Sequence, residues 1–260
     1  MPTLISPALW MHRTWTALLD FCFPVLCPYC ERCETDGASD SLLCPDCQQT
    51  VRMHAGRQCQ RCSSSVGPHV DTTHGCVHCR EERFAFEAVC SLGPYRETLR
   101  SACLRAKMQS GHSISMGLAQ QLWNLRHPEI KTWNPDLVIP VPHRWWEQVR
   151  RPHISPSTLA ETLASKAGIP ARFDLLSKIK HTEKQALLSV TKRKANLRGA
   201  FGIGGRATLG GATVLLVDDI LTTGTTAHEC AKILKQAGAS RVFVAVFARA
   251  AAFSAGSSTG

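Results

Sequence analysis

The sequence lacks any apolar run of about 18 residues, so no segment of it is expected to span a membrane. Residues 1–21 mix Trp10 and Trp15 with His12 and Arg13, and no small-residue cleavage site follows them. A secretory signal peptide is therefore not expected. We expect an amphipathic segment that docks on the body of a cytoplasmic protein, with attachment to a membrane surface as the alternative.

Acidic residues are scarce. The chain has 20 Asp and Glu against 30 Lys and Arg, which gives a formal net charge of +10. This balance favours acidic or phosphorylated partners but does not select a fold. A hydrophobic content of 44% excludes a disordered chain, and 260 residues are enough for one sizeable α/β domain with a smaller segment beside it.

Cysteine, in contrast, is abundant. The chain has 13 cysteines, and all except Cys103 and Cys230 lie at or before Cys90. Eight of them form C-x2-C pairs, and in each half of the segment thirteen residues separate the two pairs. The second half repeats the first at an offset of 32 positions. The eight are Cys27, Cys30, Cys44, Cys47, Cys59, Cys62, Cys76 and Cys79.

This doubled spacing predicts two structural zinc sites, each with four thiolate ligands. About 55 residues with few large apolar side chains do not fold on a core alone, so metal binding supplies the folding free energy. We favour one ion in each repeat. The crossed arrangement, in which the first pairs of the two repeats share one ion, stays open. Cys103 and Cys230 lie in expected helices and are not expected to be ligands.

Apolar runs alternate with helical patterns after the cysteines. Strands are expected at 89–95, 136–141, 214–219 and 241–248, and helices around Leu99, Cys103 and Ala106 and at 114–125, 157–167 and 225–237. This alternation predicts an α/β fold with a mostly parallel twisted sheet and helices on both faces. We divide the chain into an N-terminal segment (1–21), a double zinc ribbon (22–82), the α/β domain (83–250) and a disordered tail (251–260).

The stretch VLLVDDILTTGTTAHECAKIL combines features that point to a ligand. Asp218 and Asp219 end a buried strand, where ligands of open parallel sheets bind. The following Thr/Gly loop opens a helix, and its amides and hydroxyls suit a phosphate. Gly224 permits a backbone conformation that a side chain would block. Since carboxylates repel phosphate, they are expected to hold what lies beside it, either sugar hydroxyls or Mg²⁺. Phosphate next to a diol indicates a ribose 5-phosphate.

A second notable stretch is basic. Residues 178–198 hold seven Lys or Arg and one Glu, which gives a local charge of +6. A loop of this length inside a compact domain is more often functional than a solvated connection. It contains no aromatic residue for base stacking, so any binding to single-stranded nucleic acid is expected to be independent of sequence.

VLLVDDILTTGTT resembles the 5-phosphoribosyl-1-pyrophosphate (PRPP) motif of type I phosphoribosyltransferases. With the ribbon, residues 20–250 resemble the ComF competence-protein family. FCFPVLCPYC is similar to that family's entry into the ribbon, and DLVIPVPHR to its pyrophosphate-side strand and loop. Single positions that match are Tyr95, Leu99, Lys107, Gln185, Leu188, Arg193, Asn196, Gly199 and Phe201.

The resemblance implies a role for each matched group. Asp218 and Asp219 would bind the ribose hydroxyls, directly or through Mg²⁺. The loop that would hold the 5′-phosphate consists of Thr222, Thr223, Gly224, Thr225 and Thr226. The residues that would face the pyrophosphate are Arg144, Arg151, Lys180, Lys184 and Arg193. After its Pro-Val-Pro strand the family usually reads Arg-Gly-Phe-Asn-Gln, whereas this chain reads RPHISP from Arg151 and retains only the arginine.

Three functions remain open at this point. The chain is a phosphoribosyltransferase, which moves phosphoribose from PRPP to a nitrogen base or another nucleophile; or it is a binding module for PRPP or single-stranded DNA; or its ribbons mainly recruit a protein partner. No catalytic base is identifiable, so no residue is assigned as catalytic.

Overall fold

The computed structural model describes residues 26–32, 41–53, 56–142, 155–179, 197, 199–204 and 208–250 of the chain. The elements are α2 (Pro45–Met53), β1 (Val89–Pro94), α3 (Glu97–Ala106), α4 (His112–Trp133), β2 (Leu137–Pro140), α6 (Ser155–Ala167), β3 (Leu176–Lys178), β4 (Phe201–Ile203), β5 (Thr213–Leu221), α8 (Thr225–Gln236) and β6 (Arg241–Arg249). Within these ranges no helix has the length and apolar character needed to cross a bilayer.

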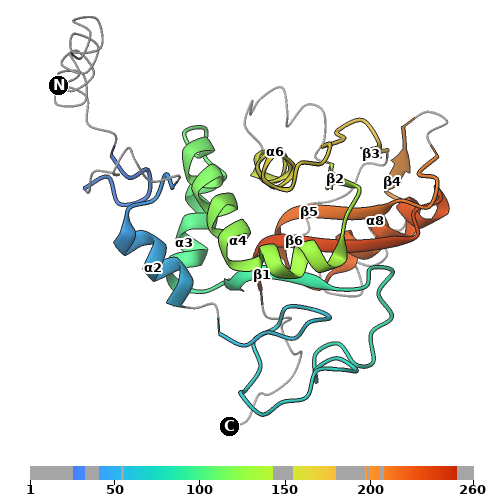
Figure 1. Ribbon diagram of the computed structural model, residues 1–260, viewed down its shortest axis with the longest axis horizontal. Coiled ribbons are helices and arrows are strands. Elements are labelled where there is room, and N and C mark those ends of the chain that lie inside the picture. Colours follow the sequence, from blue (N-terminus) through green and yellow to red (C-terminus); the bar gives the residue numbers. More distant parts are fainter. Residues whose placement is uncertain are drawn as a thin grey trace, which may run out of the picture.

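Four strands form a parallel sheet in the order β1-β6-β5-β2 (Figure 1). A separate antiparallel pair, β3 with β4, lies beside it. The expected α/β fold with a parallel sheet is confirmed. β5 and β6 are the long central strands, and they are apolar on both faces because helices cover both.

Alternating side chains of β5 enter two different cores. Leu215 and Val217 pack with the residues of α3, α4 and α6, whereas Val214 and Leu216 pack with those of α8. The same alternation continues along β6. Because side chains of a strand point to opposite faces in turn, the next two residues of β5, Asp218 and Asp219, are directed to different faces of the sheet.

Helix α4 is longer than the expected 114–125 and continues through Pro128 to Trp133. Proline removes one backbone hydrogen bond from a helix, which usually ends it. Here the last turns are held by packing, since Ile130 is buried and the ring of Trp133 stacks on Phe243 with centroids 4.7 Å apart. Tertiary contacts therefore outweigh the local cost of the proline.

The first cysteine segment packs on α3 and α4 (Figure 1). Leu43 is buried against Gly117, where an added Cβ would approach the Leu43 side chain to 2.9 Å. Two polar contacts fix the same face: Leu42 donates its N–H to Gln120 at 3.1 Å, and Arg52 donates to Gln121 at 2.9 Å. This segment and the two helices share one hydrophobic core.

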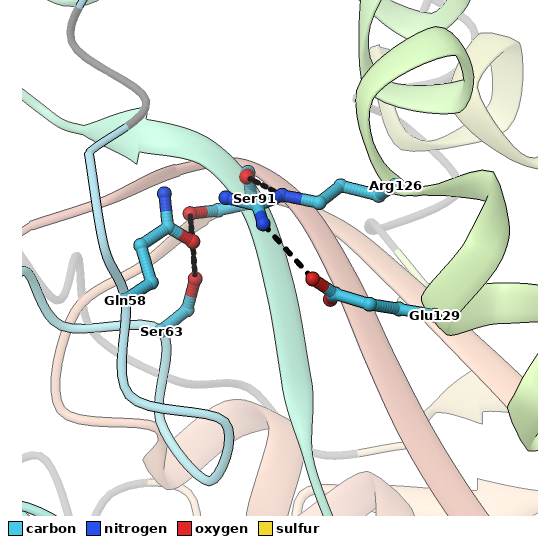
Figure 2. Close-up of polar contacts among 5 residues, drawn as sticks. All are labelled: Gln58, Ser63, Ser91, Arg126 and Glu129. Atoms are coloured by element: carbon cyan, nitrogen blue, oxygen red, sulfur yellow. Dashed lines mark hydrogen bonds and ion pairs between the residues drawn. The ribbon is translucent and has the colours of Figure 1, made fainter. Parts of the chain in front are cut away.

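The second cysteine segment, residues 56–87, packs on the edge strand β1, and Figure 2 shows the polar contacts. The hydroxyls of Ser63 and Ser91 lie 2.7 Å apart, and Ser63 donates to the side-chain oxygen of Gln58 at 2.6 Å. On the other side of the strand, Arg126 of α4 donates to the carbonyl of Ser91 at 2.9 Å and pairs with Glu129 at 2.9 Å. The edge of the sheet is thus covered rather than open to solvent.

Candidate metal centres and ligand pocket

The eight paired cysteines form two clusters, one from each repeat. Cys27, Cys30, Cys44 and Cys47 make the first, and Cys59, Cys62, Cys76 and Cys79 make the second. Sequential pairing is therefore confirmed and the crossed arrangement is excluded. Among the described residues, His69, His74 and His78 belong to neither cluster.

The sulfur positions fit a tetrahedral zinc site. Zinc–thiolate bonds of about 2.3 Å place two sulfur ligands about 3.8 Å apart. In the second cluster the sulfur–sulfur distances are 3.7 Å for Cys59 and Cys79, 3.6 Å for Cys62 and Cys76, and 3.9 Å for Cys76 and Cys79. In the first, Cys30 and Cys44 lie 3.8 Å apart. Both clusters have the ligand set and spacing of closed structural sites.

Replacing Cys103 or Cys230 by serine is expected to leave the zinc content of the purified protein unchanged at two ions per chain. Both cysteines are buried in helices, α3 and α8, and lie outside the clusters. Atomic absorption on each variant checks this result, with Cys44→Ser as the matched control that loses one of the ions. A loss of zinc from Cys103→Ser or Cys230→Ser would contradict the ligand assignment.

A pocket of about 560 Å³ opens at the carboxyl ends of all four parallel strands. It is lined by Tyr95 after β1, Val141 and Pro142 after β2, Asp218 to Thr222 of β5 and its loop, and Ala250 after β6. Lys107, Lys178, Phe201 and residues 224–227 complete the wall. This is the edge at which open parallel sheets bind ligands.

The two carboxylates lie in this pocket, and β5 continues two residues beyond them to Leu221. β2 ends its pairing at Val217, so Asp218 and Asp219 emerge where only β6 still pairs with β5. The Asp219 N–H donates to the Asp218 carboxylate at 2.8 Å. Asp218 and Asp219 lie at the expected edge of the sheet, but the predicted strand, 214–219, ended two residues too early.

Lys107 follows helix α3 and forms an ion pair with Asp219, with Nζ and Oδ2 2.9 Å apart. Burial raises the pKa of Asp218 to about 8, and the neighbouring charge of Asp219 adds to this rise. Burial alone would lower the pKa of Lys107, but the charges of Asp219 and Asp218 outweigh it and raise the pKa. The pocket therefore holds a cation beside its carboxylates. In the sequence analysis Lys107 is only one of the positions that match the ComF family, and no role is predicted for it.

The loop Thr222–Thr226 leads from β5 into helix α8. Gly224 is the N-cap and has a left-handed φ of 76°, which a residue with a side chain adopts only with strain. A Cβ there would also lie 3.2 Å from Phe84 of the second cysteine segment. Because the helix dipole favours a negative charge at this end, the loop has the geometry of an anion site.

Arg249, the last residue of β6, is only 5% exposed and lies behind the pocket wall, a position for which no role was predicted from the sequence. It donates to the carbonyl of Cys62 at 2.9 Å and to that of Leu221 at 3.1 Å. It also donates to the carbonyls of Thr222 and Ala250. The available signal was an arginine at the carboxyl end of β6, directly after seven consecutive apolar residues.

The other predicted pyrophosphate ligands lie outside the described residues. They are Arg144, Arg151, Lys180, Lys184 and Arg193. The described end of the basic stretch, Lys178, does line the pocket, and its Nζ lies 6.0 Å from the ring centroid of Phe201.

Comparison with known proteins agrees with this geometry. The family model described as "Phosphoribosyl transferase domain" matches residues 157–254. Competence protein F of Haemophilus influenzae is 29% identical over 212 residues, which cover 80% of this chain and 90% of the relative. DNA utilization protein YhgH is 26% identical in Salmonella typhimurium, over 78% of this chain and 88% of the relative. YhgH of Escherichia coli (strain K12) is 25% identical, over 83% and 87%.

The fold, the pocket and the family model define a chain with a phosphoribosyltransferase-type domain, preceded by two four-cysteine clusters that fit a double zinc ribbon. Its similarity to Competence protein F over most of both chains confirms the resemblance to the ComF competence-protein family.

Proposed function

We propose that this protein binds PRPP, or a related ribose 5-phosphate ligand, together with Mg²⁺ in the pocket at the end of the sheet. The observation that carries the proposal is that one pocket is lined both by Asp218 with Asp219 and by four residues of the Thr/Gly loop, Thr222, Gly224, Thr225 and Thr226. Carboxylates accept hydrogen bonds from ribose hydroxyls, directly or through the water shell of Mg²⁺. The loop offers the 5′-phosphate a helix N-terminus.

The charges of the pocket suit a ligand with two anionic ends. Lys107 and Lys178 both line it, together with the two carboxylates. Because Lys107 already pairs with Asp219, an incoming Mg²⁺ would compete with it for that carboxylate. The displaced ammonium would then be available to a phosphate oxygen. We assign Arg144, Arg151, Lys180, Lys184 and Arg193 to the pyrophosphate on the family pattern alone.

Phosphoribosyl transfer passes through an oxocarbenium-like state, so catalysis requires a held ring and a stabilised leaving pyrophosphate rather than a strong base. Among the described residues that line the pocket, Asp218 and Asp219 are the only acids, and both are assigned to the sugar. The site therefore supports binding of PRPP more directly than it supports transfer assisted by a general base. Whether transfer takes place depends on whether a nucleobase or another nucleophile binds beside the ribose.

Calorimetric titration with PRPP, with and without Mg²⁺, tests the proposal. Binding that requires Mg²⁺ and is competed by ribose 5-phosphate supports it, whereas no heat in either condition refutes it. Pyrophosphate release measured with a panel of nucleobases separates a transferase from a PRPP sensor. A reducing, cytoplasmic setting is consistent with eight free thiols in metal-type clusters.

A second candidate function is weak, sequence-independent binding of single-stranded DNA. It is supported by the local charge of +6 across residues 178–198 and by the name of the YhgH relatives, "DNA utilization protein". A closing loop needs only one or two cations for pyrophosphate, and a larger number of cations suits a polyanion. Recruitment of a protein partner by the ribbons remains a third possibility, which zinc-dependent co-purification would favour.

Changing Lys192, Arg193 and Lys194 together to glutamine is expected to abolish binding to single-stranded DNA. Any residual binding at low salt should show a slope of log affinity against log salt that is smaller by about 0.7 for each lost phosphate contact, because fewer counterions are released. Fluorescence anisotropy with a labelled oligonucleotide across a salt series measures both. Affinity that survives the triple substitution, or no binding by the unchanged protein at low salt, would confine the loop to the pocket.

A further inference from the structure

We propose that Arg249 is a positioning residue for the phosphate loop, and that the second four-cysteine cluster holds the loop through it. The proposal rests on the proposed function, because it concerns the same pocket. The guanidinium connects two parts of the chain that are distant in sequence: the second cluster at Cys62, and the junction of β5 with the loop at Leu221 and Thr222.

These contacts act on the loop where it begins. A trans peptide is planar, and its carbonyl and N–H point in opposite directions. A donor that holds the carbonyls of Leu221 and Thr222 therefore fixes two consecutive peptide planes, and with them the direction of the N–H groups of Thr222 and Thr223. An anion site made of backbone amides depends on that direction.

The contact of Arg249 with the second cluster is fixed as well, because the carbonyl of Cys62 accepts a hydrogen bond from Arg249 and its sulfur belongs to the metal site. A second contact runs in parallel. Phe84 packs against the second cluster and also lies beneath Gly224. The next residue, Ala85, donates its N–H to His228 of α8 at 3.0 Å. The second segment thus supports the loop at its start, at its glycine and at the first turns of its helix.

Electrostatics favour the same arrangement. Arg249 is buried, and in the described part of the chain no carboxylate forms an ion pair with it. A site with four thiolates and one zinc ion has a net negative charge, because the thiolates outnumber the charges of the ion. The metal-loaded cluster is therefore a counter-charge for the guanidinium, in addition to fixing its acceptor.

The test is calorimetry with ribose 5-phosphate on the zinc-loaded full-length chain. Arg249→Gln is expected to weaken binding by about tenfold or more, and Arg249→Lys by less, because lysine keeps the charge but loses the planar fork of donors. Zinc content should stay at the level of the unchanged protein. Arg126→Gln is the matched control, since Arg126 also donates to a sheet carbonyl, that of Ser91, but does not contact the loop.

A ligand-free readout separates this proposal from the proposed function. In Arg249→Gln the amide resonance of Gly224 is expected to shift, while those at the centre of α4 stay in place. If the unchanged protein binds no ribose 5-phosphate, the proposed function fails and the resonance alone decides the positioning role. Unchanged affinity with an unmoved Gly224 resonance overturns the proposal, as does an equal loss in Arg126→Gln. Should Arg249→Gln not fold, Phe84→Leu makes the same test at the parallel contact.

Discussion

Asp218→Asn combined with Asp219→Asn is expected to abolish Mg²⁺-dependent PRPP binding and leave the fold intact. Two acceptors that bound Mg²⁺ would keep ionised are lost at the sugar, and together they contribute on the order of 3 kcal/mol, or more than about 100-fold in affinity. The fold survives because both residues line the pocket at the end of the sheet, and neither belongs to a hydrophobic core. Calorimetry with PRPP and Mg²⁺ gives the affinity, and circular dichroism checks the fold.

The single variant Asp218→Asn is expected to raise the stability of the ligand-free protein, although it weakens ligand binding. Burial raises the pKa of Asp218 to about 8, from an ordinary value of 3.8. The folded carboxyl therefore keeps a proton that the unfolded chain has lost, so this group makes the ligand-free protein less stable as the pH rises from about 4 to 8. Asparagine has no such charge. The variant is expected to be more stable than the unchanged protein, by a margin that grows over this window and is constant above it.

Thermal unfolding of both proteins at several pH values without Mg²⁺ measures that margin. Leu216→Ala is a useful comparison, since Leu216 lies on the same strand and face but in the core, and its loss should destabilise the protein at every pH.

Two outcomes would contradict these predictions. If Asp218→Asn combined with Asp219→Asn leaves PRPP binding unchanged, the carboxylates do not hold the sugar. If Asp218→Asn is less stable at pH 8, its carboxylate has a structural role instead.

The fold was predictable because its signals are local. Short apolar runs such as Val214–Val217 separated by helical patterns indicate a parallel sheet without any knowledge of contacts. The doubled cysteine spacing likewise identified all eight cluster residues and favoured their sequential pairing, which only the structure decided. In contrast, β3 and β4 have three residues each, with a glycine in the middle of β4, and short strands of this kind carry no readable alternation.

The site was only partly predictable, because much of it depends on contacts between distant residues. Asp218, Asp219 and the Thr/Gly loop form one continuous stretch, and the sequence identified it. Lys107 reaches Asp219 from the end of helix α3, and Arg249 reaches Cys62, 187 residues earlier in the chain. No local pattern encodes such pairs.

Removing zinc is expected to destabilise the whole protein, not only the cysteine segments. The first cluster is part of the main core: Cys27, Cys44 and Cys47 pack in the same cluster of buried residues as Leu99 of α3 and Leu118 of α4. Structural zinc contributes about 10–16 kcal/mol to the folding of small metal-dependent segments. Even a third of that corresponds to a fall in melting temperature of about 10 °C or more for a chain of this size.

Thermal unfolding followed by circular dichroism, with and without a strong chelator, measures this fall. Cys44→Ser should reproduce the effect of the chelator, whereas Cys103→Ser, which replaces a buried thiol of the same core without removing a ligand, should cost far less. Because Lys107 follows the end of α3, the same loss of zinc is expected to weaken the pocket at the ion pair between Lys107 and Asp219. A chain that melts at the same temperature after its zinc has been removed would show that the ribbons fold on their apolar contacts alone.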